Sequence, residues 1–158
     1  MFLEIGSRRV IFCNATAQPD SAWVARQARN VCWELEELKV PIKVLIHDRD
    51  SKYSSDLDAV FSPAGIRIAR TPFRSPRANA VCERVLGTLR RECLGWLIIL
   101  GERHLLQVLR EYLDHYNRAR PHRALNLRPP EPQPIPDGGK IVRRERLHGL
   151  INEYSRVA

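Results

Sequence analysis

The segment IKVLIHDRD, residues 42–50 of this 158-residue chain, is the most informative about its fold. Its first five residues are β-branched or apolar except for one lysine, which predicts a central strand buried on both faces. The apolar run ends at His47, so Asp48 is expected at the carboxyl edge of a sheet, where α/β proteins present side chains to ligands. Asp48 is therefore a candidate metal-binding carboxylate.

The segments that follow this strand complete a crossover unit. A short helix is predicted over residues 54–61, a turn over 63–65 and a second strand over 66–69. A strand, helix, strand unit of this length indicates two parallel strands.

Two further elements are predicted upstream. Residues 2–16 hold two apolar runs around a Gly6-Ser7 turn, a pattern typical of a β-hairpin. Asp20 is a plausible N-cap for the helix that follows. The apolar stripe of this helix, expected to pack on a sheet, consists of Val24, Ala28, Val31, Leu35 and Leu38.

The downstream half is predicted to contain two helices and a tail. Residues 71–78 are too rich in proline and arginine for a regular element, and helices are expected from Asn79 to Leu94 and from Glu102 to Tyr116. The second helix has the apolar stripe Leu105, Leu109, Tyr112 and Tyr116. Six of the eleven prolines lie within residues 121–136, which predicts an extended segment before a basic strand or helix over 140–158. The whole predicts an α/β fold with a mixed sheet flanked by helices and a Pro-rich tail.

The charge of the chain points to an anionic partner. Lys and Arg number 26 against 18 Asp and Glu, a formal net charge of +8, which favours nucleic acid first and an anionic membrane surface second. No apolar run reaches the roughly 18 to 20 residues that span a bilayer, so a cytoplasmic protein is expected. The four cysteines form no CxxC pair and are expected to be buried thiols.

Glu83 is the natural partner of Asp48. It lies in the first turn of the helix after the proline-rich loop, with 34 residues between it and Asp48, and shares a helix face with Gly87 and Arg90. Phosphodiester chemistry uses two divalent metals about 3.5 to 4 Å apart, held by hard oxygen ligands. Gly87 would let a DNA backbone come close, and Arg90 would meet a phosphate. The alternative is that Asp48 is a turn residue and Glu83 a helix-dipole acid.

Three motifs resemble the DDE-type integrase core of bacterial insertion-sequence transposases. They are His-Asp-Arg-x-Ser-x-Tyr at residues 47–53, Asn-Ala-x-x-Glu-Arg with Gly-Thr-Leu and Arg-Arg-Glu at 79–92, and HYNRARPHRAL at 115–125. The resemblance implies an RNase H-like fold, Mg²⁺ or Mn²⁺ as cofactor, DNA as partner and homo-oligomers on paired DNA ends. It assigns Asp48 and Glu83 as catalytic metal ligands, with Asp50 in the variable slot of its motif, and it gives Arg90 a DNA contact.

A group of arginines flanks the loop and the helix around Glu83. We expect them to contact DNA phosphates, although a solvated surface is the commoner role of such residues. They are Arg74, Arg77, Arg84, Arg90 and Arg91. In the tail motif, Tyr116 is expected in the core and His122 is expected to be structural.

One departure from the family pattern affects the expected activity. The family places a first catalytic Asp on a strand that would precede residue 1, and neither Glu4 nor Asp20 matches it. We therefore expect residues 1–120 to form a partial, N-terminally truncated core without its first strand, residues 121–158 to form an extension, and the chain alone to show little strand transfer. A non-catalytic DNA-binding remnant and an RNase H-like nuclease are the alternatives.

Overall fold

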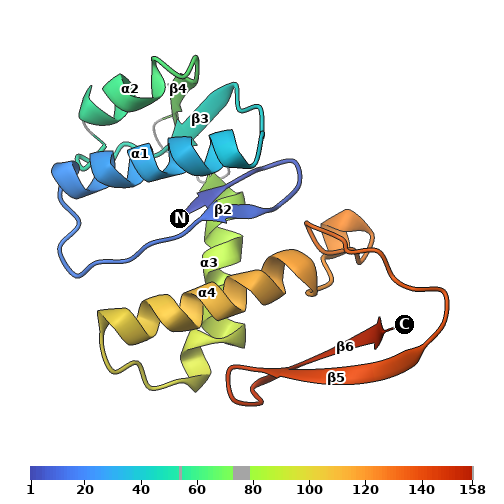
Figure 1. The fold of residues 1–158 in the computed structure, drawn as a ribbon. Helices are drawn as coiled ribbons and strands as arrows, with labels where there is room; N and C mark the ends of the chain where they lie inside the picture. The colour runs from blue at the N-terminus through green and yellow to red at the C-terminus, as the bar shows by residue number, and fades with distance from the viewer. Residues whose placement is uncertain (54, 73–78, 158) are drawn as a thin grey trace.

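The structure is a computed structural model that describes residues 1–53, 55–72 and 79–157 (Figure 1). It is a mixed α/β arrangement of helices and short strands, as the sequence predicts. The strands are β1 (Phe2–Leu3), β2 (Val10–Phe12), β3 (Val44–His47), β4 (Arg67–Arg70), β5 (Lys140–Arg146) and β6 (Ile151–Val157). The helices are α1 (Ser21–Glu37), α2 (Ser55–Phe61), α3 (Ala80–Glu92), α4 (Glu102–Arg118) and the 3₁₀ turns η2 (Leu94–Trp96) and η3 (Arg123–Leu125).

The hairpin and the first helix form as predicted. β1 and β2 pair antiparallel, and the side chain of Asp20 accepts a hydrogen bond from the Trp23 N–H at 2.7 Å, which caps α1. The apolar stripe of α1 is buried except at its end. Leu38 is 37% exposed because the helix ends at Glu37, so its burial was predicted wrongly.

The predicted crossover is present, but its first strand is less buried than expected. β3 and β4 pair in parallel, with Val44 opposite Arg67 and α2 between the strands in sequence. Burial of β3 on both faces was predicted wrongly, since Val44 is 36% and Ile46 45% exposed. In the described part of the chain β3 has a strand partner on one side only, and this leaves part of its apolar surface uncovered.

The strands of the described residues pair in twos rather than in one mixed sheet. The three pairs are β1–β2, β3–β4 and β5–β6. Figure 1 shows α1 lying over the region of β2 and β3, and α3 extending from this region toward α4.

Two apolar clusters hold the described residues together. One packs the stripe of α1 against Leu57, Phe61 and Ile66 of the crossover unit. The other packs α3 and α4 with Val10 and Leu147, and its Tyr112 and Cys93 have no exposed surface. Of the stripe predicted for α4, Leu109, Tyr112 and Tyr116 are buried and Leu105 is half-buried. Of the four cysteines, which are all free thiols, Cys93 alone is fully buried and the other three are half-buried.

The C-terminal hairpin is anchored to α4 near its turn. Between β5 and β6, Leu147, His148 and Gly149 all have positive φ angles, which produce a tight reversal. The Leu147 N–H donates to Glu111 at 2.6 Å, and Arg146 pairs with both Asp114 and Glu153 at 2.5 and 3.1 Å. Residues 129–139 contain neither helix nor strand.

Among the residues that the structure describes, no helix is both long enough and apolar enough to cross a membrane.

Candidate metal and nucleic-acid site

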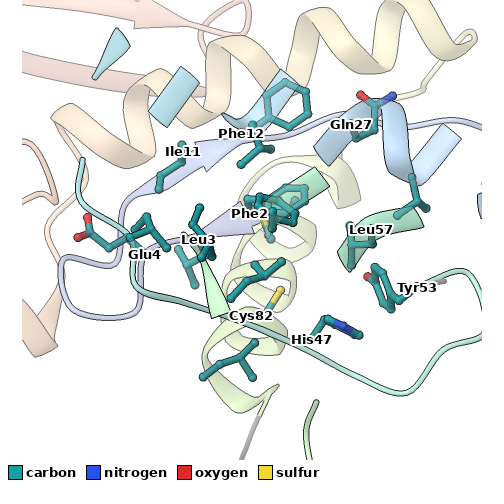
Figure 2. Close-up of a pocket in the computed structure, with 18 of the residues that line it drawn as sticks. Phe2, Leu3, Glu4, Ile11, Phe12, Gln27, His47, Tyr53, Leu57 and Cys82 are labelled. Carbon is teal, nitrogen blue, oxygen red and sulfur yellow. The ribbon is translucent and has the colours of Figure 1, made fainter. Parts of the chain in front are cut away.

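A groove of about 310 Å³ lies between β1 and β3. Two runs of consecutive residues border it, 1–5 around β1 and 44–48 around β3. Residues of α1 and of the start of α3 also line it. Figure 2 shows Phe2 and Leu3 of β1, His47 of β3 and Cys82 of α3 around this space. Asp48 is thus part of the groove wall.

Asp48 directly follows β3, as the sequence predicts, and its side chain is exposed. Its Oδ1 accepts the N–H of Asp50 at 3.1 Å, a bond that fixes the turn after the strand. Its carbonyl oxygen lies 2.5 Å from Nδ1 of His47, whose ring packs against Tyr53 with centroids 4.6 Å apart. The other ring nitrogen of His47, Nε2, is buried and has no hydrogen-bond partner among the described residues.

Asp50 has a different environment from Asp48. Its carboxylate accepts the N–H of Lys52 at 3.0 Å and forms an ion pair with the Lys52 ammonium at 2.9 Å. These hydrogen bonds hold the pKa of Asp50 below its usual value. The negative charge of Asp50 is therefore already balanced by a neighbour on the same loop.

Glu83 lies in the first turn of α3 and is exposed. Asn79 occupies the predicted N-cap position, although its side chain makes no capping hydrogen bond. The adjacent Cys82 is a half-buried free thiol. Burial raises the pKa of its thiol, the Met1 amino group lowers it, and the carboxylates of Glu83 and Asp48 raise it further. Cys82 lines the same groove as Asp48 and is adjacent to Glu83 in the chain, although 34 residues lie between the two acids.

The predicted phosphate-binding arginines divide into two groups. Arg84, Arg90 and Arg91 are exposed on α3, whereas Arg74 and Arg77 lie outside the described residues. The guanidinium of Arg91 lies over Gly87, because a Cβ built on this glycine would be 3.1 Å from its Nη1. The gap predicted at Gly87 is thus occupied by a cationic side chain, which bonds weakly to Thr88 at 3.5 Å.

The tail motif supplies interactions that the sequence analysis missed. Arg120 donates to both carboxylate oxygens of Glu92, at 2.7 and 2.6 Å, and Tyr112 donates to one of them at 3.0 Å. The side-chain amide of Asn117 bonds to both the N–H and the C=O of Val10, at 3.0 and 2.9 Å. These residues hold the end of α3 and the strand β2 against α4. An acid in the last turn of a helix, where the helix dipole disfavours a negative charge, was the signal that could have indicated a distant cationic partner.

Tyr116 and His122 of the same motif have the structural positions that the sequence predicts. Tyr116 is 3% exposed and lies in the core, and His122 packs edge-on against its ring. Nε2 of His122 lies 3.1 Å from the carbonyl oxygen of Tyr116. Burial is the main cause that lowers the pKa of His122, so this imidazole is neutral at neutral pH and serves a structural role.

The structure is a mixed α/β arrangement in which Asp48 follows β3 in the wall of the groove and Glu83 lies in the first turn of α3. Residues 64–130 match the family model of the integrase core domain, in agreement with the resemblance to DDE-type cores. The match includes β4, α3, α4 and the tail motif, and therefore contains Glu83 but not Asp48. No curated protein matches the chain.

The carboxylates of Asp48 and Glu83 could provide some of the ligands of a hard divalent cation. Asp48 and Glu83 both offer exposed carboxylate oxygens, the ligands that Mg²⁺ and Mn²⁺ prefer. In the described ranges, no group of three or more His, Cys, Asp or Glu side chains is placed to hold a metal. The two acids therefore fit as part of a ligand set.

Proposed function

We propose that this chain acts on DNA as an integrase or transposase core, with Asp48 and Glu83 as ligands of a catalytic Mg²⁺ or Mn²⁺. The observation that supports this function is the groove, whose lining includes Asp48 after β3 and Cys82, the residue next to Glu83 in the first turn of α3. The match to the integrase core domain supports the assignment of Glu83.

Each residue has a distinct role in this proposal. Asp48 and Glu83 would hold divalent cations, which would supply activation of the attacking oxygen and stabilisation of the leaving oxygen of a DNA strand. Asp48 is preferred to Asp50 because Lys52 already neutralises Asp50. Arg84, Arg90 and Arg91, together with Arg74 and Arg77, contact the phosphates and position the duplex. The RNase H-like arrangement belongs to the same proposal.

Metal binding is the direct test of the two acids. In a Mn²⁺ titration followed by calorimetry, Asp48→Asn and Glu83→Gln should each weaken binding about tenfold or more, since each removes a charged oxygen ligand. Glu102→Gln is the matched control for Glu83, because Glu102 is also an exposed acid in the first turn of a helix. Asp137→Asn controls for Asp48 with another exposed aspartate. Equal losses in the controls and in the site variants would contradict the assignment.

DNA binding without strand chemistry is a second candidate function. The net charge of +8 and the exposed arginines of α3 favour it. An end-labelled DNA duplex incubated with Mn²⁺ distinguishes the two functions. Cut or joined products that disappear in Glu83→Gln support the enzyme, whereas salt-sensitive DNA binding with no product above the Glu83→Gln background supports the binding protein.

A further inference from the structure

The C-terminal hairpin, β5 and β6, has one covered face and one open face. Opposite residues of an antiparallel pair lie on the same face, and the two faces alternate along each strand. One face carries Arg146, Ile151 and Glu153. Arg146 forms an ion pair with Asp114 of α4 at 2.5 Å, and Ile151 packs against the apolar cluster of α3 and α4. This face therefore rests on α4, and the other face of the hairpin is turned outward.

The outward face combines two arginines with two exposed apolar side chains. Arg143 lies opposite Tyr154, and Ile141 lies opposite Arg156 at the next position of this face. Tyr154 is 69% and Ile141 is 62% exposed. The Cβ atoms of opposite residues are about 4.5 to 5.5 Å apart, so each apolar side chain has an arginine beside it. We call these four residues, Ile141, Arg143, Tyr154 and Arg156, the hairpin platform.

The charges of the hairpin platform are available to an anion. Residues 140–157 contain five Lys or Arg and two Glu. Arg156 has no ion-pair partner among the residues that the structure describes. Arg143 pairs with Glu145 at 2.5 Å, but both side chains are more than half exposed, and such surface pairs contribute little stability. A phosphate can therefore replace Glu145 as the partner of Arg143.

The aromatic ring of Tyr154 is not used by the rest of the described chain. Within these residues it makes no ring contact and no hydrogen bond. An exposed aromatic ring on the face of a sheet offers a stacking surface to a nucleobase, and this surface accepts any base. The bases of a duplex already stack on one another, so a base that stacks on Tyr154 must be unpaired.

We propose that the hairpin platform binds single-stranded nucleic acid, with a base stacked on Tyr154 and phosphates paired with Arg143 and Arg156. A duplex supplies phosphates but no free base face, and an apolar peptide leaves both guanidinium groups without an anion. This second nucleic-acid site goes beyond the proposed function, because it takes no metal and lies outside residues 64–130. Figure 1 shows the hairpin beside α4 and away from α1 and β3.

Oligonucleotide binding in EDTA tests the hairpin platform without catalysis. The probe is a fluorescein-labelled oligothymidylate of about 12 nucleotides, a length typical of single-strand sites, titrated with the full chain and followed by anisotropy. We expect saturable binding. Tyr154→Leu should weaken it about fivefold or more because stacking is lost, whereas Tyr154→Phe should stay within about twofold of the wild type. No saturable binding, or equal affinities of the two variants, overturns the proposal.

Matched variants elsewhere on the surface locate the site. Trp33→Leu removes another exposed ring, 65% accessible, from α1 and should leave the affinity unchanged. Arg156→Glu should weaken binding and reduce the salt slope by about 0.7 or more, the value for one phosphate contact with a single strand. Arg29→Glu makes the same change in charge on α1 and should keep the wild-type slope. Effects of these controls that equal those of the platform variants overturn the proposal.

Duplex DNA separates this proposal from the proposed function. Tyr154→Leu should not change the affinity for a duplex of oligothymidylate and oligoadenylate of the same length, whereas Arg90→Glu should weaken it. A loss of duplex affinity in Tyr154→Leu as large as the loss for the single strand overturns the proposal, because no unpaired base would then be needed. Loss of the metal role of Asp48 and Glu83 would leave single-strand binding in EDTA intact, and failure of single-strand binding would leave the Mn²⁺ titration unaffected.

Discussion

Among single residues, Glu92 has a carboxylate that accepts three side-chain hydrogen bonds. It accepts two hydrogen bonds from Arg120 and one from Tyr112, and the guanidinium of Arg120 lies 5.8 Å from the centre of the Tyr116 ring. Because Glu92 is the last residue of α3, this cluster fixes the helix that carries Glu83 at its other end. Arg120 of the tail motif thus has a structural role that its sequence did not reveal.

Loss of the Glu92 charge should destabilise the chain in a pH-dependent way. Glu92→Gln should lower the free energy of unfolding by about 1 kcal/mol at pH 7, a modest cost because the side chain is partly exposed and solvent screens the pair. The hydrogen bond from Arg120 is the main cause that lowers the pKa of Glu92. Its stabilisation is therefore full above the unfolded pKa of about 4.3 and is lost as pH falls through the lower folded value.

Urea titrations of the wild type and Glu92→Gln at several pH values measure this effect. The difference in midpoint should be constant from about pH 6 to 8 and should shrink below about pH 4. Glu102→Gln, which changes an exposed acid of α4, should show a smaller difference at pH 7. A gap between wild type and Glu92→Gln that widens as the solution becomes more acidic would contradict the ion-pair explanation.

Asn117 should be among the most sensitive polar residues. Asn117→Ala leaves the N–H and C=O of Val10 without their side-chain partner, and Val10 is 4% exposed. We expect a loss of about 2 kcal/mol or more in the free energy of unfolding, since two buried backbone groups become unsatisfied. Asn152→Ala, an exposed position on β6, is the control and should change stability by less than about 0.5 kcal/mol. Equal effects of the two changes in thermal denaturation would show that the Val10 contact contributes little.

At the scale of elements, α1 and the β3–α2–β4 crossover could be predicted because their determinants are local. Asp20, the N-cap of α1, accepts a hydrogen bond from Trp23 three residues later. The spacing of the apolar residues in this helix matches its buried face. Burial of β3 could not be predicted in this way. An apolar sequence indicates that the side chains of a strand prefer burial. The residues that cover these side chains belong to other segments of the chain, so local sequence does not reveal them.

Because β3 is buried on one side, substitutions at two adjacent positions should change the free energy of unfolding by different amounts. Ile46→Thr should change the free energy of unfolding by less than about 0.5 kcal/mol because Ile46 is 45% exposed. Leu45→Thr should cost about 1 to 3 kcal/mol, because Leu45 packs against the cluster of α1 and α2. Chemical denaturation of both variants measures the difference. A larger loss at Ile46 than at Leu45 would indicate that the covered face is the opposite one.

At the scale of the whole molecule, the positive charge should govern association with DNA. Arg90→Glu should weaken binding to duplex DNA and reduce the salt slope by about 1 or more, because a phosphate contact is replaced by repulsion. Arg29→Glu on α1 makes the same change in net charge at another exposed position. Fluorescence anisotropy at several salt concentrations compares them, and identical slopes for the two variants would remove Arg90 from the DNA surface.

The positions of Asp48 and Glu83 relative to β3 and α3 could be predicted, whereas their surroundings could not. Asp48 lies after β3 and Glu83 begins α3, as the pattern indicated, because strand ends and helix starts are local features. The groove, the pairing of Lys52 with Asp50 and the position of Arg91 over Gly87 depend on side-chain placement. The division of the molecule between 1–120 and 121–158 remains a prediction, although Leu147 packs in the same cluster as α3 and α4.

The bond between Asn117 and Val10 has a consequence for how the chain folds during its synthesis. The two residues are 107 positions apart, so the ribosome makes Val10 long before its partner exists. At about 5 to 20 residues per second, the interval is roughly 5 to 20 seconds. During that time the N–H and C=O of Val10 must bond to water or to a temporary partner. The contacts of the nascent N-terminal hairpin are consequently completed only after α4 has left the exit tunnel.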